Sequence, residues 1–74
     1  MKVEISKDME WQLEYADFDV EEVKSTLPEL FPNAKSIEVT YCEDNWLEVL
    51  VDEKYYSVHV TGDVKDGKLY EGKM

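Results

Sequence analysis

Residues 36–61 constrain the fold more than any other part of the chain, because apolar and polar residues alternate through most of this stretch. A period of two residues is typical of strands that bury one face and expose the other. Two short acidic segments interrupt the alternation. The pattern therefore predicts three consecutive antiparallel strands joined by tight turns, and we expect this meander to form the centre of the fold.

The parity of the apolar positions predicts the register of the meander. Odd-numbered residues are apolar on both sides of residues 43–45, so we expect a three-residue loop there that pairs Tyr41 with Leu47. The third strand is apolar at even positions instead. This change predicts a two-residue turn at residues 53–54 that pairs Val51 with Tyr56.

The same register predicts a second, mixed face of the meander, with Cys42 beside Trp46 and Glu48 beside His59. A Cys–His nucleophile pair needs a contact of about 2.6 to 3.2 Å. Cys42 and His59 would instead lie on strands two apart, at roughly 10 Å, so an ordinary cross-strand pair between Glu48 and His59 is favoured. Spaced metal-ligand motifs and glycine-rich phosphate loops are absent from the sequence. No catalytic site, metal site or cofactor is expected.

The segments before the meander predict a hairpin and a helix. Alternation in residues 1–16 predicts an N-terminal β-hairpin with a loop at residues 6–8, and a single bulged strand is the alternative. Residues 19–31 change to the period of an amphipathic helix, with Asp19 as N-cap and a hydrophobic staple between Phe18 and Val23. Pro28 is expected to end the regular helix near Thr26, before a last irregular turn.

The tail completes the predicted fold class. Asp66 and Gly67 form a dipeptide typical of a type I′ turn, which predicts a weak hairpin that pairs Val64 with Leu69 within residues 62–74. Together the elements predict one small α+β domain over residues 1–74. Its order is ββαβββ, with one amphipathic helix packed on the three-stranded meander and the weak hairpin at the C-terminus.

The charge of the chain is its strongest functional signal. Eighteen Asp and Glu residues stand against eight lysines and no arginine, which gives a net charge of −10. Direct binding to nucleic acid or to an anionic membrane is thereby disfavoured, because both need basic side chains. A lone cysteine, together with no secretory signal and no long apolar run, predicts a cytoplasmic protein.

The acidity is concentrated in residues 8–22 and 36–53, neither of which contains a lysine. Such blocks aid solubility, but a rigid negative surface also fits a basic groove on another protein. The sequence predicts a non-catalytic acidic module that binds a basic protein surface and inhibits a nucleic-acid-binding protein by mimicry, as anti-defence proteins do. The alternative is a homo-oligomeric structural or accessory protein that uses an exposed sheet face or edge. The predicted contact residues are Glu10, Glu14, Asp17, Glu21, Glu22, Glu43, Asp44, Asp52 and Glu53, with Trp46 and Tyr55 as aromatic anchors.

Overall fold

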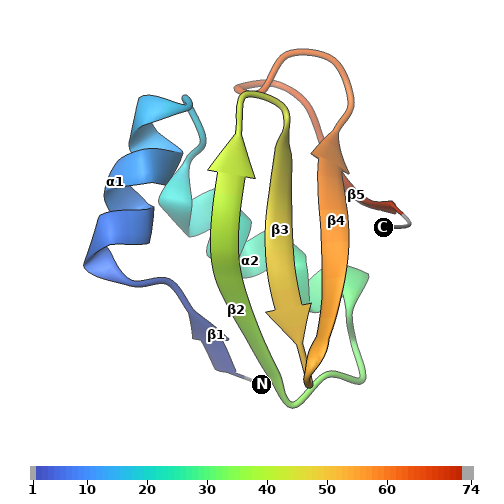
Figure 1. Ribbon diagram of the computed structural model, residues 1–74. Coiled ribbons are helices and arrows are strands. Elements are labelled where there is room, and N and C mark those ends of the chain that lie inside the picture. Colours follow the sequence, from blue (N-terminus) through green and yellow to red (C-terminus); the bar gives the residue numbers. More distant parts are fainter. Residues whose placement is uncertain (1, 73–74) are drawn as a thin grey trace.

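The computed structural model describes residues 2–72 and shows a five-stranded mixed sheet with one helix packed across one face and a second helix alongside the sheet (Figure 1). The elements are β1 (Lys2–Glu4), α1 (Lys7–Tyr15), α2 (Val20–Leu30), β2 (Ser36–Glu43), β3 (Trp46–Val51), β4 (Lys54–Val60) and β5 (Leu69–Gly72). The strands lie side by side in chain order, with β1 parallel to β2 and the other neighbours antiparallel. The α+β class is confirmed, but the predicted order ββαβββ is wrong, because the observed order is βααββββ. Met1, Lys73 and Met74, at the ends of the predicted hairpins, lie outside the described residues.

The predicted N-terminal hairpin is replaced by a short strand and a helix. Ser6 caps α1, and its hydroxyl accepts a hydrogen bond from the backbone N–H of Met9 at 3.1 Å. Met9 and Leu13, one helical turn apart, are buried in the core. Trp11 and Tyr15, which the alternation placed on the buried face, are instead exposed by 70% and 83%. Residues four apart lie on the same face of a strand and also on the same face of a helix, so the alternation alone does not distinguish the two.

The end of α1 is a Schellman motif, which turns the chain directly into α2. The backbone N–H of Phe18 donates to Leu13 at 2.8 Å and that of Asp17 donates to Glu14 at 3.0 Å. Asp17 adopts a left-handed conformation with φ of 68°, which is the C′ position that glycine usually occupies. The motif brings the last turn of α1 close to the first turn of α2.

The predicted start of α2 is confirmed, whereas its predicted end is too early. Asp19 is the N-cap, and Phe18 and Val23 are both buried as the hydrophobic staple requires. Pro28 lies inside the helix, which runs on to Leu30 rather than ending near Thr26. Proline removes one hydrogen bond of the last turn, and the burial of Leu27 holds the helix against the sheet nonetheless.

The meander is confirmed, but a β-bulge at Thr40 changes its register. Ile37 and Val39 pair with β3 as predicted, whereas beyond the bulge Cys42 pairs with Leu47 in place of Tyr41. Cys42 is therefore buried and Tyr41 lies on the open face, so the predicted positions of these two residues are wrong. The extra residue of the bulge exchanges the faces of the residues that follow it in β2, so a turn of only two residues, 44–45, is sufficient.

The register of β4 and the place of the tail also differ from the prediction. Val51 pairs with Lys54 around a two-residue turn, two positions from the predicted pairing with Tyr56. A shift by two residues leaves the same side chains on each face. The tail forms no hairpin of its own, because Leu69 pairs with Val60 and β5 extends the main sheet.

The core lies between the sheet and the helices. Its fully buried side chains come from both layers and are Leu13, Leu27, Ile37, Leu47, Val49 and Val58. Within residues 2–72, α2 packs across this inner face, and α1 lies alongside β2 (Figure 1) and contributes Met9 and Leu13 to the core. We call the opposite side of the sheet the open face.

Candidate functional site

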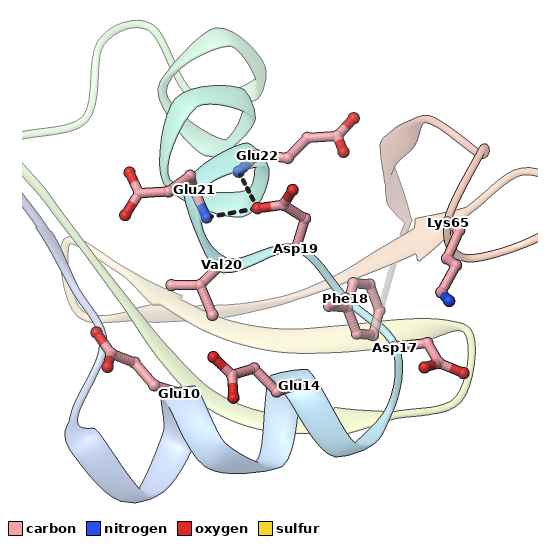
Figure 2. A pocket seen from close by; sticks show the side chains of 9 residues that line it. All are labelled: Glu10, Glu14, Asp17, Phe18, Asp19, Val20, Glu21, Glu22 and Lys65. Carbon is pink, nitrogen blue, oxygen red and sulfur yellow. Dashed lines mark hydrogen bonds between the residues drawn. The ribbon is translucent and has the colours of Figure 1, made fainter.

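The strongest candidate site is a concave surface between α1 and the first turn of α2, which we call the acidic groove (Figure 2). Its volume is about 670 Å³. Six carboxylates and one ammonium group surround a small apolar floor. The lining residues are Glu10, Glu14, Asp17, Asp19, Glu21 and Glu22, with Phe18 and Val20 as the floor and Lys65 at the rim.

Local structure fixes the carboxylates of the acidic groove. Glu10 and Glu14 are four residues apart on α1 and therefore lie on the same helix face. The left-handed backbone of Asp17 directs the chain toward α2, whose first turn carries Glu21 and Glu22. Five predicted contact residues from the first acidic block thus come together in one groove. The sequence assigned two of them, Glu10 and Glu14, to a strand, whereas both lie on α1.

Part of the negative charge of the acidic groove is already neutralised within the domain. The Asp19 carboxylate accepts hydrogen bonds from the backbone N–H groups of Glu21 at 3.0 Å and Glu22 at 3.3 Å. Lys24 forms ion pairs with Glu10 at 3.7 Å and with Glu21 at 4.0 Å. The side chain of Lys24 is more than one-third exposed, so these pairs contribute little to stability.

Three carboxylates of the acidic groove, those of Glu14, Asp17 and Glu22, form neither an ion pair nor a side-chain hydrogen bond within residues 2–72, whereas that of Asp19 accepts its two hydrogen bonds. Asp17 follows the C-terminus of α1, where the helix dipole is negative and no basic residue stands in the last turn. Negative charge is therefore unfavourable here for the isolated domain. A cation that entered the acidic groove would relieve this repulsion.

The tip of the turn between β2 and β3 continues the acidic surface. Asp44 lines a neighbouring depression together with Asp17 and Lys65. Asp63 and Asp66, from the loop between β4 and β5, line the same depression. Asp44 is therefore close to the first acidic block, and this proximity depends on the tertiary fold rather than on any pattern in the sequence.

The other predicted tip has a structural role that the sequence did not reveal. The Asp52 carboxylate accepts hydrogen bonds from the backbone N–H groups of Lys35 at 3.0 Å and Ser36 at 3.0 Å, which lower the pKa of Asp52. Asp52 and Glu53 both have positive φ, of 46° and 75°, in the tight turn before β4. This turn lies at the opposite end of the sheet from the turn between β2 and β3 (Figure 1), which contains Asp44.

The remaining predicted residues lie on the open face. Trp46 is in contact with Tyr41 on one side and His59 on the other. Glu43 pairs with Trp46, and its carboxylate accepts a hydrogen bond from the hydroxyl of Tyr41 at 2.5 Å, which raises the Tyr41 pKa. Tyr55 is 55% exposed and pairs with Leu50, toward the other end of the sheet.

The structure separates Cys42 from His59. Cys42 is in the core, where burial raises the pKa of its thiol, and His59 is on the open face between two aromatic rings. The predicted pair of Glu48 with His59 is also absent, since Glu48 pairs with Ser57 and accepts a hydrogen bond from the Thr40 hydroxyl at 3.0 Å. Nucleophilic catalysis by a Cys–His pair is thereby excluded for these two residues.

Two further properties of residues 2–72 concern metal binding and membrane insertion. No three acidic, histidine or cysteine side chains in this part of the chain are arranged so that they could hold a metal ion. Neither α1 nor α2 is long and apolar enough to cross a membrane. Comparison of the chain with protein-family models, with curated proteins and with solved structures finds no match.

Proposed function

We propose that this domain is a non-catalytic binding module that engages a basic protein surface through the acidic groove. The observation that carries the proposal is the convergence of six carboxylates from two helices and their connection on one concave surface that has a single lysine at its rim. Charge of one sign gathered in a cleft steers the association of oppositely charged partners. Lysine and arginine side chains are the groups that fit it.

The acidic groove also has an apolar floor that suits such side chains. Phe18 is buried beneath it and Val20 is partly exposed. The methylene stems of lysine and arginine pack on apolar surface while their charged ends remain among carboxylates. A groove of about 670 Å³ has room for several such side chains.

We further propose that the basic partner surface is one that binds nucleic acid, so that the domain inhibits its partner by mimicry. Glu10 and Glu14 are held about 5 to 6 Å apart at their Cβ atoms by one helical turn, and two helix ends fix the other carboxylates. A fixed array of anions can take the place of phosphates on a basic surface. With a net charge of −10 and no arginine, the chain itself repels nucleic acid and would compete with it.

The test is co-purification from a lysate at low salt with the protein and two triple variants of equal charge. The first combines Glu14→Gln, Asp17→Asn and Glu22→Gln, which removes the unpaired carboxylates of the acidic groove. The control combines Glu29→Gln, Glu38→Gln and Glu71→Gln, which lie outside it. We expect the protein and the control to retain partners that elute between about 0.1 and 0.5 M salt and that double-stranded DNA displaces, whereas the groove variant loses them.

Three outcomes would contradict the proposal. Equal losses in both variants would mean that net charge alone attracts the partners. Partners that DNA does not displace would leave binding intact but overturn mimicry. Retention of no partner by the protein would overturn the binding module itself.

A homo-oligomer is the second candidate, and the exposed aromatic side chains of the open face favour it. Tyr41, Tyr55 and Tyr70 are exposed by 42%, 55% and 46%. Such side chains are enriched at protein interfaces. Gel filtration at about 0.5 M salt distinguishes the two candidates, because a dimer that forms through apolar contacts persists at an ionic strength that dissociates an electrostatic complex.

A further inference from the structure

The open face carries a continuous row of aromatic rings near the turn between β2 and β3. One ring comes from each of four adjacent strands, and we call Tyr41, Trp46, His59 and Tyr70 the aromatic row. The ring centroids are separated by 5.5 Å, 6.4 Å and 5.7 Å in that order. These separations are those of rings in contact.

The backbone of β5 is adapted to the aromatic row. A Cβ atom at Gly72 would lie 2.5 Å from Cδ2 of His59, so the imidazole occupies space that any other residue would fill. Gly72 pairs with Ser57, and its neighbour Tyr70 pairs with His59. The glycine thus allows His59 to lie flat between Trp46 and Tyr70.

Within residues 2–72, the helices leave most of the aromatic row uncovered. The helix α2 packs on the opposite side of the sheet (Figure 1), where Leu47 and Val58, the neighbours of Trp46 and His59, are buried. The helix α1 lies alongside β2, and its exposed Trp11 and Tyr15 line a depression together with Tyr41. Tyr41 and Tyr70 are nearly half exposed. The aromatic row is therefore a surface separate from the acidic groove.

Two carboxylates lie directly beside the aromatic row. Glu43 pairs with Trp46, and Glu48 pairs with Tyr41 across the strands. Among the described lysines, Lys68 stands opposite Thr61 just before β5, and Lys2, on β1, is engaged with Glu4 at 3.0 Å. The row thus combines aromatic faces with carboxylates.

We infer that the aromatic row is a docking site for arginine side chains of an extended segment of a partner protein. A guanidinium group stacks on aromatic rings and also donates hydrogen bonds to carboxylates, so it uses both features of the site. This inference goes beyond the proposed function and does not depend on it, because no residue of the aromatic row lines the acidic groove.

Charge complementarity favours this occupant over two others. Bases of single-stranded nucleic acid also stack on aromatic rows, but Glu43 and Glu48 repel phosphates and the chain has no arginine to neutralise them. A second copy of the domain would bring the same carboxylates face to face in a symmetric contact. The domain also contains no arginine that could stack on the aromatic row.

The test compares two labelled peptides of equal charge, one of alternating arginine and glycine and the other of alternating lysine and glycine. We expect fluorescence anisotropy at about 0.15 M salt to show the arginine peptide bound about 3- to 10-fold more tightly. Tyr70→Leu and Trp46→Leu should reduce that preference. Tyr55→Leu is the matched control, since it removes a comparably exposed ring from the same face but outside the row.

Backbone NMR of the unaltered protein gives a readout that does not depend on variants. The arginine peptide should shift amide signals around Trp46 and His59 rather than those of α1 and the first turn of α2. The triple groove variant should keep the preference for arginine, which separates this inference from the proposed function. Equal affinity for both peptides, shifts confined to the acidic groove, tighter binding of oligothymidylate, or a dimer that Trp46→Leu dissociates would each overturn the inference.

Discussion

Replacement of Asp17 by glycine should make the domain more stable. Asp17 holds a left-handed conformation with φ of 68° at the C′ position of α1, where a non-glycine residue is strained by up to about 1 kcal/mol, less for Asp than for most. The change also removes a negative charge from the negative end of the helix dipole, which is worth about 0.3 to 1 kcal/mol. Glycine loses more entropy on folding, by roughly 0.4 to 1 kcal/mol. We expect a net gain of about 0.5 kcal/mol, which raises Tm by roughly 2 to 4 °C in a domain of this size.

Thermal and urea unfolding of three variants separate the two causes. Asp17→Asn keeps the tolerance for left-handed backbone but removes the charge, so its gain measures the electrostatic part. Asp17→Ala removes the charge but is strained at this φ, and we expect it to be about 1 kcal/mol less stable than Asp17→Gly. If Asp17→Ala equals or exceeds Asp17→Gly in stability, the left-handed assignment of this residue is wrong. Asp17→Gly should also weaken the binding of a basic partner, which would be a trade of function for stability.

Three further predictions test other parts of the structure. The backbone hydrogen bonds to Asp52 lower its pKa below the ordinary 3.8, so the charged form contributes stability that is complete above that value and is lost as the pH falls through the lowered pKa. The urea midpoints of the protein and of Asp52→Asn should therefore differ at about pH 6 and approach each other as the pH falls through the lowered pKa, and a constant difference would contradict this. The buried thiol of Cys42, whose pKa burial raises, should react with a thiol reagent far more slowly in the folded than in the unfolded protein, and fast labelling of the native state would contradict the bulge at Thr40. Gly67→Ala should lower Tm by several degrees, roughly 4 to 8 °C for each kcal/mol lost, because its Cβ would overlap the carbonyl oxygen of Thr61; an unchanged Tm would contradict the geometry of this loop.

Local signals predicted the parts of the fold that depend on neighbouring residues. The start of α2 follows from Asp19 as N-cap and from the staple between Phe18 and Val23, all within one turn. The strands of the meander follow from their period. The register does not, because parity counting assumes an unbroken ladder and the bulge at Thr40 leaves no mark in the alternation.

The N-terminal error had a physical signal that could have prevented it. Residues 7–15 contain no β-branched residue and are rich in Glu, Gln, Leu and Met, which favour helices. Ser6 stands before them as a good N-cap. Composition found Glu10 and Glu14 as candidate contact residues, but the acidic groove exists only because this segment is a helix that ends beside α2. The shape of the acidic groove therefore could not be predicted from the pattern of charges in the sequence.

The backbone conformations of acidic residues bear on whether the charge serves more than solubility. Within residues 2–72, the non-glycine residues with positive φ are Asp17, Asp52 and Glu53, and all are acidic. The backbone strain at Asp52 is offset by the hydrogen bonds that its carboxylate accepts from backbone N–H groups. Asp17 and Glu53 form no such side-chain hydrogen bonds among the described contacts, and glycine would be less strained at both positions. Solubility needs only exposed charge, which an unstrained helix surface supplies equally well. Carboxylates held where the backbone favours glycine are better explained by a need for charge at those places, and at Asp17 that place is the acidic groove.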